Sequence, residues 1–307
     1  MKKYINYSII IVLFFFVFKI LTNSTSIIDT IVFSMEIWKN NIFPTLFPFF
    51  IISDLLINYG FVEIVSNFFS PLMKLFKIKK ECAFIFVLSI FSGFPSNSKY
   101  TKELYEKGVI DEYTATKVLT FTHFSNPLFI LGTLSIFLNQ KLALIVLISH
   151  YLGNLIVGMI YRNYHPSYDE KKVFFEFNKN SDSFIQVLTN SIIKTIDTLL
   201  LLLGIITCFL VLTTIIDNTL NLPTFIQYIL NGIIEMTQGL KYVSILNIDL
   251  RLKTIISTFF LSFGGICIHT QVKSILKGTN IKYLPYLLAR ILHGIISSII
   301  VLILLYL

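Results

Sequence analysis

The chain has 307 residues, of which 55% are hydrophobic and 14% are charged, and its formal net charge is +8. Soluble globular proteins carry about 25% charged residues, so this composition excludes an ordinary soluble protein. The basic excess does not indicate nucleic-acid binding, because the Lys and Arg residues stand in short connections between apolar runs, as is typical of residues that face lipid headgroups.

Runs with few or no charges recur along the chain, and several reach the roughly 17–25 residues that a transmembrane helix needs. They are Tyr4–Phe18, Asn40–Ser53, Val118–Gln140, Leu142–Tyr161, Thr198–Ile216, Thr254–Val272 and Ile291–Leu307. They predict an all-α, multi-pass integral membrane protein embedded in the lipid bilayer. Residues 1–26 are expected to form a retained N-terminal transmembrane helix, because Leu21–Ser24 has no small-x-small cleavage site.

Residues 27–161 form the first predicted unit. Within it we expect helical segments at Ile27–Lys39, Asn41–Tyr59, Phe61–Phe76, Cys82–Phe94, Pro95–Val109, Thr114–Leu138 and Leu142–Tyr161. The Ile27–Lys39 segment is short and is expected to lie in the membrane interface, as is Asp54. Cys82–Phe94 is too short to span, so with Pro95–Val109 it predicts a re-entrant hairpin.

The stretch from Ser92 to Lys99 is the most informative feature of this unit. An uncharged run enters it from Cys82, and Gly93, Pro95 and three small polar residues then interrupt that run. Lipid cannot satisfy a broken backbone, so such a break persists only where it is buried in protein or lines a cavity. Broken helices at membrane depth are typical of transporter binding sites.

Residues 162–183 predict a solvated loop, and residues 184–307 predict a second unit. In this unit we expect helical segments at Ser183–Lys194, Asp197–Ile216, Leu222–Leu240, Thr254–Ile268 and Tyr283–Leu307. Leu88–Gly93 resembles Leu261–Gly265, and each unit contains a long apolar helix near its start. Paired interrupted segments in corresponding positions predict two repeats, and the expected helix directions favour an inverted arrangement.

The first break has the features of an anion site. Pro95 suits the first position of a new helix, so the N–H groups of Ser96, Asn97 and Ser98 are expected to lack intrahelical partners and to point into the break. The positive end of the helix dipole lies behind them and favours an anion. A merely structural kink is the alternative.

Three further interruptions carry candidate residues. His269, Thr270 and Gln271 follow the break at Gly264–Gly265, Asn126–Pro127 interrupts a long uncharged helix, and Glu235 is an ionisable residue at membrane depth. Glu235 is therefore a candidate for proton coupling. The structural alternatives are a packed His269, an Asn126 amide that bonds the freed backbone, and a Glu235 close to the interface.

Other polar residues in apolar segments have a structural interpretation. His123 and His150 are expected to be packed or hydrogen-bonded, and Arg290 is near enough to a helix start to snorkel to the interface. Cys82, Cys208 and Cys267 have spacings that suit neither a zinc site nor a disulfide framework. No phosphate loop, paired-carboxylate site or nucleophile elbow is present, so we expect no enzyme activity, no cofactor and no metal site.

Five segments also carry a family resemblance, in the order Asn41–Phe50, Ser92–Pro95, Ser125–Ile130, Glu235–Gly239 and Gly264–Gln271. Together they resemble the YlbJ-type sporulation integral membrane proteins, which belong to the nucleoside-recognition ("Gate") domain group. The resemblance runs from about residue 30 to about residue 290, and it departs from the family pattern after Pro95, where this chain has Ser96-Asn97-Ser98.

The resemblance implies two Gate-type repeats, a fold similar to concentrative nucleoside transporters, and a role in endospore formation. It implies transport of the small dicarboxylate dipicolinate across the outer forespore membrane, with the coupling ion left open. Gly93, Pro95, Ser96, Asn97 and Ser98 are then expected at one end of the anion site, Gly265, His269, Thr270 and Gln271 at the other, with Asn126 and Glu235 completing the cavity. A carrier for nucleosides or other small solutes and a non-transporting membrane scaffold are the alternatives.

Overall fold

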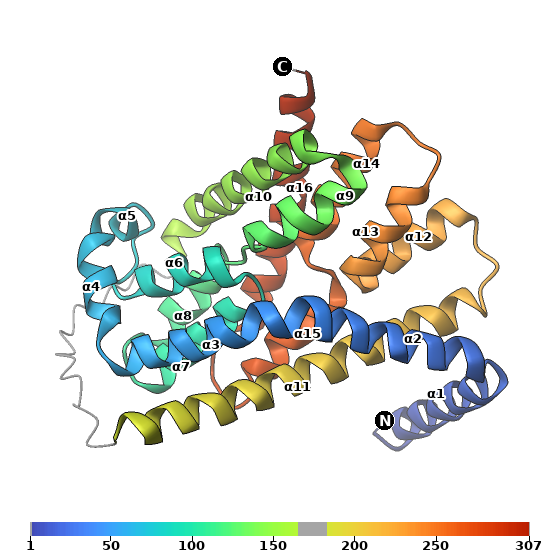
Figure 1. Cartoon of the computed structure of the whole chain (residues 1–307), viewed down its shortest axis with the longest axis horizontal. Helices are drawn as coiled ribbons and strands as arrows, with labels where there is room; N and C mark the ends of the chain where they lie inside the picture. Colours follow the sequence, from blue (N-terminus) through green and yellow to red (C-terminus); the bar gives the residue numbers. More distant parts are fainter. Residues whose placement is uncertain (1, 165–182, 307) are drawn as a thin grey trace.

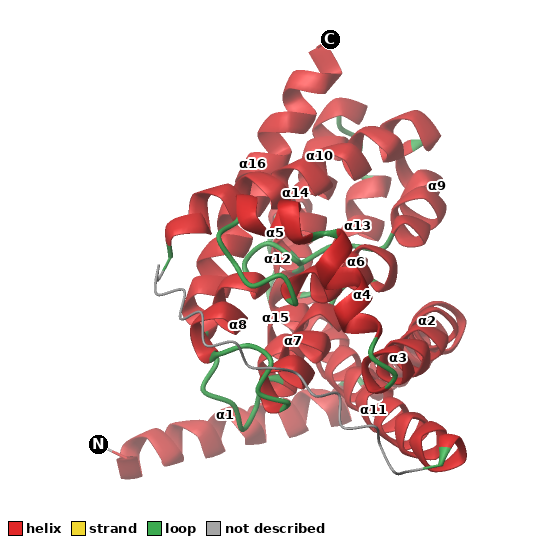
Figure 2. Cartoon of the chain, turned by 90° about the vertical axis from the view of Figure 1, so that its left-hand side faces the viewer, coloured by secondary structure: helices red, strands yellow, loops and turns green. Residues whose placement is uncertain are grey.

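The computed structural model describes residues 2–164 and 183–306, and across these residues the chain is helical, without a strand (Figure 1, Figure 2). Within this described part of the chain, five helices are long and apolar enough to cross a membrane: Ser24–Asn58, Gln140–Asn163, Phe184–Asp217, Leu250–Ile275 and Tyr283–Tyr306. The prediction of an all-α, multi-pass membrane protein is confirmed. The predicted loop at 162–183 lies almost wholly outside the described residues.

The helices follow one another in a simple order along the chain. The first half contains α1 (Lys2–Thr22), α2 (Ser24–Ile37), the π-helical turn η1 (Trp38–Ile42), α3 (Phe43–Asn58), α4 (Phe61–Phe68), α5 (Ser70–Leu75), α6 (Cys82–Ser92), α7 (Ser96–Glu106), α8 (Glu112–Leu119), the π-helical η2 (Phe129–Leu134), α9 (Ser135–Leu138), α10 (Gln140–Ile160) and the 3-10 turn η3 (Tyr161–Asn163). The second half contains α11 (Phe184–Asp217), α12 (Thr224–Ile234), α13 (Met236–Ile245), α14 (Leu250–Phe263), α15 (Gly265–Ile275) and α16 (Tyr283–Tyr306).

Two long rods, α2–η1–α3 and α11, cross the molecule side by side (Figure 1). Polar pairs join them at regular intervals: Thr30 with Thr214 (2.9 Å), Ser34 with Thr207 (2.8 Å), and the Trp38 Nε1 donor with the Leu199 carbonyl (2.9 Å). The partner numbers fall as the first numbers rise, so the two rods are antiparallel. Buried Leu46, Phe50, Leu199 and Leu202 form an apolar cluster between the two rods, next to the Trp38–Leu199 pair.

The rods correct two predicted boundaries. The segments Ile27–Lys39 and Asn41–Tyr59 form one 35-residue helical rod rather than an interfacial helix and a separate span. Lys39, Asn40 and Asn41 suggested a boundary between two helices, but they lie in the π turn η1 and the helical rod continues through them. Ser183–Lys194 and Asp197–Ile216 likewise form the single 34-residue helix α11. Charged residues are compatible with a continuous helical backbone, since their side chains project away from it.

A second group of helices stands across these rods. Helix α16 packs against α10 and α14, and Figure 1 shows these three above the pair formed by α3 and α11. Apolar side chains on the outer faces are exposed, for example Ile156 on α10 and Ile299 on α16. An exposed apolar face on a helix of spanning length is the surface expected of a membrane protein.

Four segments of the chain are helices broken part-way. The helix pairs are α6 and α7, α8 and η2, α12 and α13, and α14 and α15. The breaks at residues 93–95, 235 and 264 are short, as predicted. The break between α8 and η2 is wider than the predicted Ser125-Asn126-Pro127 interruption, because the backbone leaves the helix at Thr120 and has no regular secondary structure over residues 122–126.

Candidate functional site

The four interruptions meet at the centre of the molecule. A Cβ added to Gly93 would lie 2.8 Å from the Asn126 nitrogen, and one added to Gly264 would lie 3.0 Å from His123 Nε2. A Cβ on Gly265 would lie 3.1 Å from the Met236 nitrogen. Gly93 and Gly264 also have φ values of +76° and +88°, a conformation that glycine adopts without strain. Glycine at these breaks therefore allows the chain to approach the Asn126 backbone, the His123 ring and the Met236 backbone closely.

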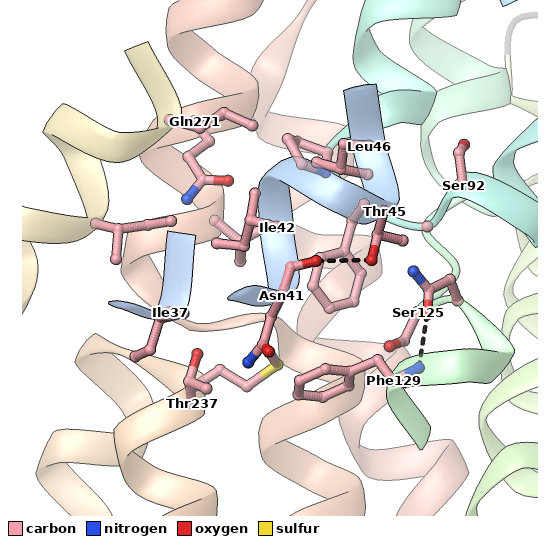
Figure 3. A pocket seen from close by; sticks show the side chains of 18 of the residues that line it. Ile37, Asn41, Ile42, Thr45, Leu46, Ser92, Ser125, Phe129, Thr237 and Gln271 are labelled. Atoms are coloured by element: carbon pink, nitrogen blue, oxygen red, sulfur yellow. Dashed lines mark hydrogen bonds between the residues drawn. The ribbon is translucent and has the colours of Figure 1, made fainter. Parts of the chain in front are cut away.

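A cavity of about 240 Å³ lies where these segments meet. Its polar lining comes from neutral side chains, namely Asn40, Asn41, Thr45, Ser92, Ser125, Asn126, Thr237 and Gln271, together with the acidic Glu235. In Figure 3, Thr237 and Gln271 lie on one side, Ser92 and Ser125 on the other, and Asn41 and Thr45 of the first rod between them. None of the described residues that line it is basic.

The structure divides the predicted site residues into two groups. Gly93, Pro95, Asn126, Glu235 and Gln271 line the cavity together, although they come from four different stretches of helix and loop. Six others do not line it: Ser96, Asn97, Ser98, Gly265, His269 and Thr270.

The polar triplet after Pro95 lies beneath the cavity wall. Ser96, Asn97 and Ser98 are fully buried. The Ser96 N–H donates to the Gly93 carbonyl (3.1 Å) and the Ser98 N–H to the Pro95 carbonyl (3.0 Å). Both acceptors precede α7, so these N–H groups lack partners within the helix as predicted, but they are bonded within the turn and are not available to an anion in the break. The turn around the cis Phe94–Pro95 peptide provides acceptors for both. Ser96 Oγ and Asn97 Oδ1 have no hydrogen-bond partner.

The residues after the second break have different surroundings. His269 is held between the Tyr283 hydroxyl (2.7 Å from Nδ1) and the Phe263 carbonyl (3.2 Å from Nε2), which corresponds to the structural alternative. Thr270 Oγ1 donates to the Ile266 carbonyl of its own helix. Gln271, one residue further on, extends its amide into the cavity (Figure 3).

Glu235 both caps a helix and lines the cavity. It is 3% exposed, and its carboxylate accepts from the Gln238 N–H (2.7 Å) and the Thr237 hydroxyl (2.9 Å) at the start of α13. Burial raises the pKa of the Glu235 carboxyl, and these two donors oppose that rise. Glu235 lies outside the five candidate membrane spans of the described residues. A buried carboxyl next to a cavity is able to hold or release a proton there.

The wide break between α8 and η2 keeps its backbone satisfied through distant side chains. The carbonyl of Thr120 accepts from Arg290, the carbonyl of His123 accepts from Asn154 (2.6 Å), and the N–H of Ser125 donates to His150 (2.9 Å). Further along, Asn126 Oδ1 accepts from the Phe129 N–H at 2.7 Å, which starts η2 (Figure 3). Because non-helical backbone at membrane depth must be satisfied within the protein, these bonds fix the cavity wall.

Arg290 and the histidines around it form the core of this support. Arg290 is 0% exposed, so the prediction that it snorkels to the interface is wrong. Its guanidinium also donates to Asn154 Oδ1 (3.1 Å), and it lies 2.8 Å from His293 Nδ1. His123 bonds the Tyr286 hydroxyl (2.8 Å) and His150 lies 2.9 Å from the Ser262 hydroxyl, so their predicted hydrogen-bonded roles are confirmed.

Comparison with known proteins gives one relative. A sporulation integral membrane protein of Bacillus subtilis (strain 168), YlbJ, is 30% identical over 88% of this chain and 75% of its own length. The chain belongs to the YlbJ family of sporulation integral membrane proteins. No protein-family profile matches the chain, and no solved structure does.

One wall of the cavity in this YlbJ-family chain was not predicted. Asn40, Asn41 and Thr45 come from the rod α2–η1–α3, which the sequence divides at Lys39–Asn41. Pro44 has no N–H, so the Asn40 carbonyl has no α-helical donor four residues on, and the π turn forms at this point. Asparagines beside two prolines in an apolar run were the available signal, and π turns are frequent at functional sites.

Proposed function

We propose that this YlbJ-family protein is a carrier that moves a small organic anion, dipicolinate, across the outer forespore membrane of a spore-forming bacterium. The observation that supports a carrier is the cavity at which four broken helices meet. Broken helices around a central solute site are the arrangement by which many secondary transporters bind their substrates. Dipicolinate itself comes from the family resemblance, and its two carboxylates match a cavity lined by amide and hydroxyl donors.

The order of the helices supports two inverted Gate-type repeats in this proposal. Each half contains a long rod, two broken helices and a final long helix, with α4 and α5 added in the first half. The rods that open the halves are antiparallel, as inversion requires. In this scheme α6–α7 corresponds to α12–α13, so the break at Gly93 pairs with Glu235 rather than with Gly264. Movement of one repeat against the other would open the cavity to either side.

The charge of the cavity sets a condition on the substrate. Glu235 is its one ionisable group among the described lining residues, and an ionised Glu235 would repel a dicarboxylate. The anion is therefore expected to bind when Glu235 is protonated. Arg290 is buried behind the Thr120–Asn126 wall, with no carboxylate within 4.0 Å among the described residues, and it adds a positive potential to this region.

A second candidate is a carrier for a neutral solute such as a nucleoside. The observation that favours it is the same lining, which has amides and hydroxyls but no basic residue in the described part of the chain. A scaffold without transport activity is the remaining alternative. It predicts that cavity residues can be replaced without loss of function.

Uptake by purified protein in liposomes tests the proposal. Labelled dipicolinate should accumulate under an acid-outside gradient, and Gln271→Leu should reduce this uptake about tenfold or more, because a hydrogen bond to a charged group is worth about 1.5–3 kcal/mol. Gln140→Leu removes an amide from an exposed position on α10 and should leave uptake unchanged.

Three outcomes separate the candidates. Uptake of a nucleoside but not of dipicolinate would support the neutral-solute carrier instead. Absence of uptake of either solute under a pH or a sodium gradient would overturn the carrier. Normal dipicolinate content in spores that carry Gln271→Leu at a normal protein level would favour the scaffold.

A further inference from the structure

A group of charged side chains lies in the protein between the rods and α7, one to two helical turns from the cavity. It consists of Asp54 on α3, Lys99 and Glu103 on α7, and Lys194 on α11. We call these four residues the charged seam. Asp54 is 4% exposed and lies near the end of the candidate span Ser24–Asn58, so its predicted interfacial depth stays a prediction while its side chain is buried in the protein. Helix α7 lies outside the five candidate spans.

Two members of the charged seam lack the partners that buried charges need. Lys99 is 7% exposed, its Nζ has no hydrogen-bond partner, and it lies 4.2 Å from the centroid of the Phe50 ring. Glu103 stands four residues further along α7, and its shielded Oε2 also has no partner. Burying a charge without a hydrogen bond is costly, so such a pair favours a state in which a proton is gained or lost.

The other two members are already paired. Asp54 accepts a hydrogen bond from the Ser191 hydroxyl of α11, and its Oδ1 lies 3.9 Å from Lys194 Nζ. Of the two carboxylates in the charged seam, Glu103 is therefore the one with an oxygen that has no hydrogen-bond partner. The groups that face Glu103 from the surrounding elements are Lys99, Asp54, Lys194 and Lys107.

The pKa of the Glu103 carboxyl lies close to physiological pH. Burial raises the pKa of its carboxyl to about 7, with Asp54 adding to the rise and the three lysines opposing it. Burial also lowers the pKa of Lys99. Both shifts favour the neutral forms of the pair, in agreement with the missing partners.

Short covalent paths connect the charged seam to the cavity. Lys99 lies three residues beyond the first residue of α7, about 5 Å of helix, and α7 begins directly after the cavity residues Gly93 and Pro95. The buried Tyr100 hydroxyl receives a hydrogen bond from Ser53 on α3 (3.0 Å) and lies next to Ser92, which lines the cavity. A change of charge on α7 would therefore act on the cavity wall.

We propose that the charged seam is a proton-binding site coupled to the cavity, in which Glu103 carries the proton and Lys99 is its counter-charge. This inference rests on the proposed carrier function. Glu103 takes a proton from water on one side of the membrane, the loss of the negative charge on its carboxyl permits α7 to move with the loaded cavity, and the O–H bond breaks when the proton leaves on the other side. Solute and proton cross together.

Infrared titration of the purified protein tests the site without any transported solute. The wild-type protein should show a protonated carboxyl band that disappears on titration around neutral pH. Glu103→Gln should lose the Glu103 part of this band and keep any part contributed by Glu235, whereas Glu106→Gln, which removes the exposed carboxylate one turn away that pairs with Lys102, should keep the full band. A band of unchanged intensity in Glu103→Gln would overturn the site.

Proteoliposomes that contain a pH dye test the coupling. Dipicolinate uptake by wild type and Glu106→Gln should acidify the lumen, and Glu103→Gln should take up dipicolinate with about a twofold smaller proton flux per dipicolinate, because a proton on Glu235 still crosses with the anion. Equal proton fluxes in Glu103→Gln and wild type would overturn the coupling while the carrier stands. If the wild type takes up no dipicolinate, the carrier and the coupling are both overturned, and the infrared titration still decides whether Glu103 binds a proton.

Discussion

The two most informative buried cations of the protein, Arg290 and Lys99, have opposite surroundings. Arg290 donates to the Thr120 carbonyl and to Asn154 and lies beside His293, so most of its guanidinium is engaged, with Nε unbonded. Lys99 Nζ has no hydrogen-bond partner and lies over the Phe50 ring.

The difference follows from the chemistry of the two side chains. A guanidinium stays charged under all physiological conditions and offers five donors in a rigid fork, so it suits the fixed support of a cavity wall. An ammonium changes its protonation readily when buried, so it suits a site that switches. We infer that the Arg290 region holds the geometry of the cavity constant and that the Lys99 region changes with protonation.

The largest expected effect is that of Arg290→Met. This substitution leaves the Thr120 carbonyl and the Asn154 amide buried without their partner, and lost hydrogen bonds to a charged group cost about 1.5–3 kcal/mol each. Thermal unfolding in detergent should therefore show a loss of about 3 kcal/mol or more, or no folded protein. Arg251→Met, at an exposed position near the start of α14, is the matched control and should unfold like the wild type. A wild-type melting temperature for Arg290→Met would contradict the supporting role.

A smaller loss is expected for Asn154→Ala in the same region. Asn154 donates to the His123 carbonyl and accepts from Arg290, so its removal frees one backbone carbonyl and one guanidinium donor. The cost should be about 1–3 kcal/mol, measured as a lower melting temperature. The same amide removed from the exposed N-cap position in Asn139→Ala should cost about 1 kcal/mol or less. Equal losses in the two variants would show that the support of His123 is unimportant.

The predictable part of the site is the part marked by local chemistry. Gly93 and Pro95 interrupt an apolar run by their own backbone properties, and Glu235 and Gln271 are polar residues in apolar surroundings, so all four were identified from sequence. Each of them lines the cavity. The all-α membrane fold was predictable for the same reason, because the spans need only length and hydropathy.

The unpredicted part depends on a contact between distant residues and on two local turns whose hydrogen bonds the sequence pattern does not show. The break after α8 is wide because Arg290, 170 residues later, bonds Thr120. Ser96, Asn97 and Ser98 lie beneath the cavity because the turn at Pro95 supplies acceptors for two of their N–H groups, which no local pattern shows. Asn40 and Asn41 marked a boundary in the sequence, yet a π turn carries the rod through them and places them on the cavity.

A pH dependence of stability is expected from Glu103. Its pKa is about 7 in the folded protein and about 4.5 in the unfolded chain, so the folded state binds the proton more tightly. Its contribution to stability is full below the unfolded value and is lost as the pH rises through the folded value. The melting temperature of the wild type should fall by a few degrees from about pH 5 to about pH 8 relative to Glu103→Gln. Parallel melting curves for the two proteins, with Glu106→Gln as the control, would contradict the shift.

The smallest expected effect is that of Lys99→Met, and it is the direct counterpart of Arg290→Met. Both substitutions replace a buried cation by the same apolar side chain. Lys99 loses no hydrogen bond, and its cation–π contact with Phe50 is exchanged for a sulfur–aromatic contact, so the change in the free energy of unfolding at about pH 6 should be within about 1 kcal/mol of zero. Thermal unfolding of both variants in one detergent measures the difference. Equal losses would show that the two cations are both structural, whereas a stable Lys99→Met with an altered pH dependence would separate the fixed region from the one that switches.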